Sequence, residues 1–80
     1  MVRVIFDIQF KKDFKKIQDN LIKKKIIKQI SKIRDNPEVG KPMRFSRKGT
    51  RELYISPFRL SYIYEKEAII ILTLYHKDIQ

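Results

Sequence analysis

Apolar and polar residues follow two different periods along the chain, and the change of period separates helical from extended segments. Residues 2–6 are rich in apolar and β-branched side chains and predict a first strand, after which Asp7 caps a helix through its carboxylate. Phe10, Phe14 and Ile17 then recur at the i, i+4 and i+7 spacing of an amphipathic helix. This helix is expected to end shortly after its third apolar position.

A second helical pattern begins at Asn20 or Leu21 and places isoleucines in one stripe. The stripe consists of Ile22, Ile26, Ile30 and Ile33, with Ile27 beside them. Asn36 and Pro37 end the pattern, because a residue that precedes proline is disfavoured in the helical region. We expect the two helices to form an antiparallel hairpin, joined by a three-residue turn, whose apolar face lies on a sheet.

The next segment, residues 38–50, contains turn-forming residues and lacks a clean period. Because it holds Gly40, Pro42 and Gly49, it is expected to be mainly loop. A short extended piece is predicted within it at Met43–Phe45.

Three extended runs complete the chain, at residues 51–55, 58–64 and 68–75, with a tight turn between each run and the next. The last run is apolar at almost every position, which is typical of a strand covered on both faces in the middle of a sheet. The sequence therefore predicts one α+β domain over residues 1–80. Its expected order is an N-terminal strand, a two-helix antiparallel hairpin and a three- to four-stranded antiparallel meander that forms a curved sheet.

The chain carries a strong positive charge. Nineteen Lys and Arg residues stand against nine Asp and Glu, a formal net charge of +10, which favours a polyanionic partner or, alternatively, reflects a lysine-rich solubilising surface. Cysteine is absent, so disulfides and thiolate metal sites are excluded, and a lone histidine with scattered carboxylates argues against a zinc site. Without a signal-like segment or an apolar run of about 20 residues, we expect a cytoplasmic protein with no membrane association.

Three residues near the ends of the last two strands are candidates for chemistry. Arg59 stands between Phe58 and Leu60, where a guanidinium either binds an anion or is a solvated residue on an open sheet face. His76 is the only histidine, and its pKa near neutrality suits a general acid or base, although a lone histidine at a strand end is more often structural. Lys77 follows it directly.

Further basic and aromatic residues predict contacts with nucleic acid. The basic residues of the loop and the strand after it are Lys41, Arg44, Arg47, Lys48 and Arg51. They are suited to tracking a sugar-phosphate backbone, or they belong to an ordinary solvated loop. Tyr54 and Tyr75 are expected to offer stacking surfaces for unpaired bases, while Tyr62 and Tyr64 are expected to pack in the core.

The order of elements and the phrases GKPMRF, RELYISPFRLSY and IIILTLYHKDI together resemble the RelE/ParE superfamily of toxins of type II toxin-antitoxin systems, in the RelE and YoeB branch of messenger-RNA interferases. The resemblance covers essentially the whole chain. It implies a RelE-like fold and a toxin that inhibits translation by cleaving messenger RNA on the ribosome, with neither metal nor cofactor. It also implies neutralisation by a RelB-like antitoxin.

The resemblance also assigns roles to the candidates. Arg59 matches the arginine of the family's YRL phrase and would stabilise charge on the scissile phosphate, His76 would protonate the departing 5′ oxygen, and Lys77 matches a basic residue of the tail. The base that activates the ribose 2′ hydroxyl is left open among Glu52, Tyr54 and a lysine. Tyr54 stands where many members have a second basic residue, and no tyrosine matches the one that RelE-type members carry beyond the basic tail.

Two other functions fit the same scaffold, a ParE-like inhibitor of DNA gyrase and a non-catalytic RNA-binding module. The nuclease hypothesis, unlike these two alternatives, requires a particular arrangement of two side chains. Arg59 and His76, distant in the sequence, must lie around one cavity that fits a phosphate. If their side chains pointed to opposite faces of the sheet, this nuclease assignment would be contradicted.

Overall fold

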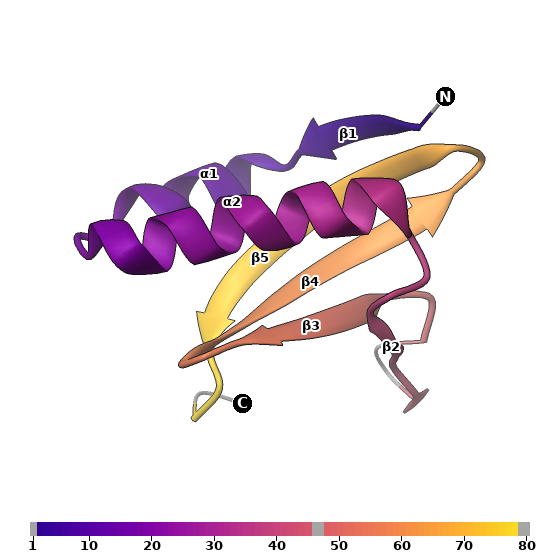
Figure 1. Cartoon of the computed structure of the whole chain (residues 1–80). Coiled ribbons are helices and arrows are strands. Elements are labelled where there is room, and N and C mark those ends of the chain that lie inside the picture. Colours follow the sequence, from indigo (N-terminus) through magenta and orange to yellow (C-terminus); the bar gives the residue numbers. More distant parts are fainter. Residues whose placement is uncertain (1, 46–47, 79–80) are drawn as a thin grey trace.

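A helical hairpin covers one face of a twisted five-stranded sheet in the computed structural model, which describes residues 2–45 and 48–78 (Figure 1). The elements are β1 (Arg3–Phe6), α1 (Ile8–Lys15), α2 (Asn20–Asp35), β2 (Lys41–Pro42), β3 (Arg51–Ile55), β4 (Phe58–Glu65) and β5 (Ala68–His76). The strands lie in the order β1-β5-β4-β3-β2, with β1 parallel to β5 and every other pair antiparallel. The predicted α+β fold is confirmed, and the last apolar strand lies inside the sheet as expected.

Both helices begin at aspartate caps, but α1 ends at Lys15, before Ile17, the last apolar position that was expected in it. The Asp7 carboxylate accepts the backbone N–H of Gln9 at 2.9 Å, and Asp19 accepts those of Leu21 and Ile22. These bonds satisfy amides that have no partner inside a helix. The helix α2 stops at Asp35, and four residues rather than three join it to α1.

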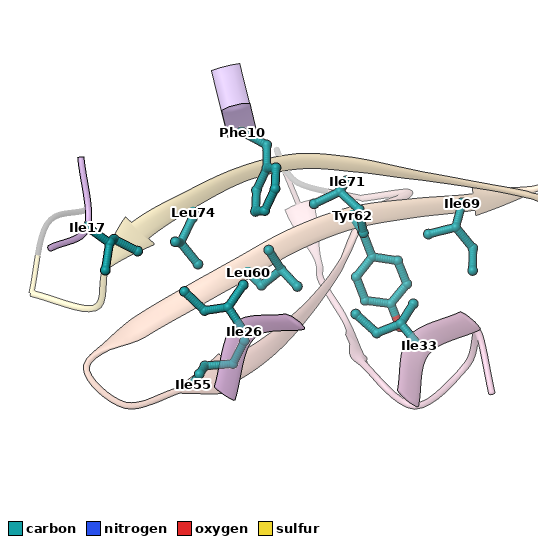
Figure 2. Close-up of a cluster of buried hydrophobic side chains, with 10 residues drawn as sticks. All are labelled: Phe10, Ile17, Ile26, Ile33, Ile55, Leu60, Tyr62, Ile69, Ile71 and Leu74. Carbon is teal, nitrogen blue, oxygen red and sulfur yellow. The ribbon is translucent and has the colours of Figure 1, made fainter. Parts of the chain in front are cut away.

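The core lies between the hairpin and the sheet (Figure 2). Its fully buried side chains are Ile26, Ile33, Leu60, Tyr62, Ile69 and Ile71. Ile27 was expected to widen the apolar stripe, but 56% of it is exposed, because successive residues of a helix point about 100° apart and Ile26 takes the inward direction. Tyr64 was also expected in the core and is 38% exposed near the end of β4.

A β-bulge in β5 reverses the side-chain alternation of that strand. Ile71 pairs with Tyr62, but the next pair joins Thr73 to Ser61, so Leu72 is an additional residue between them. As a result the buried positions run Ile69, Ile71 and then Leu74. Every side chain after Leu72 points to the face opposite to the one that uninterrupted alternation predicts.

The connection from α2 to β3 is fixed to the sheet by Tyr62. Its hydroxyl donates to the Pro37 carbonyl at 2.7 Å and accepts the Gly40 N–H at 2.8 Å, and burial raises the pKa of this phenol. A Cβ on residue 40 would lie 2.6 Å from the Tyr62 oxygen, so only glycine fits there. The short strand predicted at Met43–Phe45 forms instead at Lys41–Pro42, directly after Gly40, which Tyr62 holds.

Replacement of Tyr62 by phenylalanine should destabilise the fold by about 1–3 kcal/mol, because the Gly40 amide and the Pro37 carbonyl would lose a buried partner. Urea unfolding followed by circular dichroism measures the change. Tyr64→Phe is the matched control, since Tyr64 is partly exposed on the same strand. Equal stability of the two variants would show that the hydroxyl of Tyr62 does not hold the connection.

The carboxylate of Asp13 in α1 holds the edge of β5 next to the bulge. It accepts the Thr73 hydroxyl at 2.6 Å and the Leu74 N–H at 3.0 Å. Burial raises the pKa of Asp13, but hydrogen bonds from Thr73, Leu74 and Gln9 and the charge of Lys16 outweigh it, so that the pKa lies below its usual value of 3.8. The contact therefore depends on the ionised form.

Because the pKa is lowered on folding, Asp13 contributes stability above its unfolded-state pKa of about 3.9, and this contribution is lost as the pH falls through the lower folded value. We expect Asp13→Asn to lower the free energy of unfolding at pH 7. The difference from the wild type should shrink on acidification below about pH 4. Urea titrations across this range test it, with the exposed Asp35→Asn as control. A difference that does not change with pH would contradict the role of the charge.

Candidate functional site

Five residues form a cluster on the sheet face that the helices leave open. Tyr54 of β3 lies opposite Arg59 of β4, which lies opposite Tyr75 of β5. Residues paired directly across strands project from the same face, so these three side chains form a row. Glu52 lies two residues before Tyr54 and Lys77 two residues after Tyr75, and both share this face. We call these five residues the open-face cluster.

Glu52 is the buried centre of the open-face cluster. Only 5% of it is exposed, and its Oε2 accepts the Tyr75 hydroxyl at 2.6 Å while Oε1 lies 3.8 Å from Nη1 of Arg59. A buried carboxylate is stable only where hydrogen bonds and opposite charge replace water, and Tyr75 and Arg59 supply both. Glu52 was expected only as a candidate base, and its burial was not predicted, because the local pattern of a half-buried strand gives no signal of it.

Arg59 is held in place by this carboxylate and remains partly accessible. Its side chain is 36% exposed, and its Nε is buried without a hydrogen-bond partner within the described part of the chain. The Tyr54 ring, which is 51% exposed, lies close to two cations. Its centroid is 5.9 Å from Cζ of Arg59 and 5.5 Å from Nζ of Lys77. The arrangement offers two positive charges beside an accessible aromatic surface.

His76 does not belong to the open-face cluster. It pairs with Phe58, whose ring it meets edge-on with centroids 5.7 Å apart, and Phe58 packs against the core. It lines a hollow of about 560 Å³ together with Ile17 and Leu74, on the face that the helical hairpin covers. Arg59 does not line this hollow.

The predicted convergence of Arg59 and His76 around one cavity is therefore wrong. The bulge at Leu72 is the physical reason, because one additional residue turns His76 toward the helices and brings Tyr75 to the open face. The imidazole meets Asp78 instead, with its Nδ1 3.7 Å from that carboxylate.

The basic residues of the loop divide into three groups. Arg51 was expected to contact phosphates, but its Nη1 donates to the carbonyls of Glu38 and Gly40 at 3.0 and 2.8 Å, so it fixes the connection before β2. The residues with exposed side chains are Lys41, Arg44 and Lys48. Arg47 lies outside the described residues. Lys41 pairs with Glu52 and therefore emerges on the open face at its edge.

The described part of the chain contains neither a cluster of metal-ligating side chains nor a helix suited to spanning a membrane. Across residues 2–45 and 48–78, no group of three or more His, Asp or Glu side chains is arranged to hold a metal ion. None of the helices there is long and apolar enough to cross a bilayer.

Comparison with known proteins identifies the family. A family described as "ParE toxin of type II toxin-antitoxin system, parDE" matches residues 4–80, whereas no curated protein sequence matches the chain. Among solved structures, a YoeB/ParE toxin from Agrobacterium tumefaciens aligns with a TM-score of 0.84 at 14% identity over 94% of this chain and 98% of that one. The RelBE2 toxin-antitoxin complex from Mycobacterium tuberculosis aligns at 0.83 with 24% identity over 95% and 98%.

A third structure, the chromosomal ParDE system from P. aeruginosa, aligns with a TM-score of 0.76 at 17% identity over 95% of this chain and 96% of that one. At such identities these structures show a shared fold. The family match extends over nearly the whole sequence and agrees with that fold. This chain belongs to the ParE toxin family and is a toxin of a type II toxin-antitoxin system.

Proposed function

We propose that this toxin cleaves messenger RNA on the ribosome without a metal ion, and that the open-face cluster does the chemistry. The observation that supports it is the gathering of Arg59, Lys77 and the Tyr75–Glu52 pair on one uncovered face. The hypothesis drawn from the sequence required Arg59 and His76 around one cavity and is contradicted in that form. The proposal replaces its site with the open-face cluster, because His76 faces the helices and is given no part in the reaction.

The reaction begins when a ribose 2′ hydroxyl attacks the adjacent phosphorus, which adds negative charge to the phosphoryl oxygens. Arg59 and Lys77 stabilise that charge, and one preorganised donor is commonly worth about 3 kcal/mol. Because Glu52 already holds the Arg59 guanidinium, little reorganisation is needed when the phosphate arrives.

Two protons must move in this reaction. The phenol oxygen of Tyr75 accepts the proton of the 2′ hydroxyl while its own proton passes to Glu52 along their 2.6 Å hydrogen bond. The ammonium of Lys77 donates a proton to the departing 5′ oxygen, the role first expected of His76. The products are a 2′,3′-cyclic phosphate and a free 5′ hydroxyl. Tyr54 stacks on a base next to the cleaved bond.

A second candidate function is inhibition of DNA gyrase in the manner of ParE toxins. It is favoured by the lack of an imidazole in the open-face cluster and by the Glu52 charge, which offsets part of the charge of Arg59. The family match carries the ParE description. In either case an antitoxin is the expected partner, as in the RelBE2 toxin-antitoxin complex.

Arg59→Ala and His76→Gln separate the proposed site from the one inferred from the sequence. Primer extension on a ribosome-bound message with purified protein should show cuts for the wild type and for His76→Gln. Cleavage by Arg59→Ala should be about 10² to 10³ times slower, because a preorganised donor is lost. Loss of cleavage in His76→Gln would contradict the proposed site. Absence of cuts by the wild type, together with inhibition of gyrase supercoiling, would establish the second candidate instead.

Glu52→Gln tests the proton acceptor apart from binding. Glutamine still accepts a hydrogen bond from Tyr75 but cannot take up its proton. Single-turnover cleavage is expected to slow by about 10² to 10⁴, while the affinity for RNA stays equal or rises because a negative charge beside Arg59 is removed. A variant that cleaves at the wild-type rate would remove Glu52 from the chemistry. The wild-type fold of the variant is verified by circular dichroism.

A further inference from the structure

The loop between β2 and β3 carries an aromatic side chain in open solvent. Phe45 is 90% exposed, whereas the other exposed large apolar residues of the described chain lie between 38% and 69%. An apolar ring of this size normally contributes stability through burial, and Phe45 contributes almost none. Its position is therefore not explained by the packing of this chain.

The backbone at Phe45 is held in an unusual conformation. Its φ is +59°, a left-handed value that bulky residues rarely adopt because the side chain crowds its own carbonyl. The Phe45 carbonyl accepts the Lys48 N–H at 3.0 Å, and the Met43 N–H donates to the Thr50 carbonyl at 3.0 Å. The first bond closes a turn from Phe45 to Lys48, and the second joins the two sides of the loop just before β3 begins at Arg51.

Basic residues flank this ring in the sequence. Arg44 and Lys48 are exposed on either side of it in sequence, and no acidic residue occurs from Lys41 to Arg51. Residues 41–45 line a hollow of about 640 Å³. Because Lys41 emerges on the open face beside Glu52, the loop continues the surface that holds the open-face cluster. An exposed aromatic ring with basic neighbours is suited to single-stranded nucleic acid, whose bases stack on the ring and whose phosphates bind the cations. An apolar partner would leave these cations unpaired.

We propose that Phe45 stacks on an unpaired base of RNA while Arg44 and Lys48 bind the neighbouring phosphates, as a second contact outside the reacting site. Stacking on an aromatic ring tolerates any base, because every base has a π face, so this contact adds affinity without choosing a sequence. The inference rests on the proposed function in one respect, namely that RNA is the ligand.

Phe45→Trp gives a direct readout, because the chain has no tryptophan. Stacking on a base should quench the new fluorophore when a 2′-O-methyl oligoadenylate is added, and an oligomer of abasic sites of equal length should leave it unquenched. Leu21→Trp, at a 69% exposed position of α2, is the matched control and should respond to neither. Phe45→Ala should weaken binding of the oligoadenylate by about tenfold.

Equal quenching by the abasic oligomer, or equal quenching at Leu21→Trp, would overturn the proposal. Either result would mean that the oligomer binds through its phosphate charge, without a base stacked on residue 45. A response of Phe45→Trp to polyglutamate and none to RNA would overturn it in favour of an acidic protein partner. The 2′-O-methyl group blocks cleavage, so the measurement is independent of catalysis. Quenching by a toxin that cuts no message would support the stacking contact and disprove only the nuclease.

Discussion

The β-bulge at Leu72 is the feature on which the arrangement of both faces depends. Side chains of a strand alternate strictly, so one additional residue exchanges the faces of all residues beyond it. Here it sends Leu74 into the core and His76 toward the helices, while Tyr75 and Lys77 join Arg59 on the open face. Without the bulge, Tyr75 would lie under the hairpin and could not donate its hydrogen bond to Glu52.

The open-face cluster is built around a charge that would be costly without its neighbours. Glu52 is nearly inaccessible, and the free energy of its burial is offset by the Tyr75 hydroxyl and the Arg59 guanidinium. The same contacts fix the two groups that face a ligand. In the proposed reaction a phosphate at Arg59 would meet a cation that is already oriented but also partly neutralised, and Lys77 would supply the charge that Glu52 offsets.

Local features of the sequence were sufficient to predict most of the fold. The Asp7 cap, the isoleucine spacing of α2 and the stop before Pro37 act within a few residues, so the pattern alone locates them. The bulge could not be predicted this way, since it is tied to Asp13 of α1, sixty residues from Thr73 in the chain. The hydrogen bonds of Arg51, which was expected to contact phosphates, were missed for the same reason. Its acceptors are the carbonyls of Glu38 and Gly40, which belong to the turn after α2.

The chemistry of the open face, rather than the fold, is what separates the functions that this scaffold can carry. A YoeB/ParE toxin and a chromosomal ParDE system both share this fold, so similarity of the backbone does not decide between the two proposed functions. What differs is which side chains the strand register exposes together. In this chain the register exposes a guanidinium, an ammonium and a phenol bonded to a carboxylate, which are groups able to bind a phosphate and move protons. Glu52 bears on both proposals, because it orients these groups for cleavage but also offsets part of the Arg59 charge, so the reactivity of the oriented groups rather than their presence distinguishes the nuclease from the gyrase inhibitor.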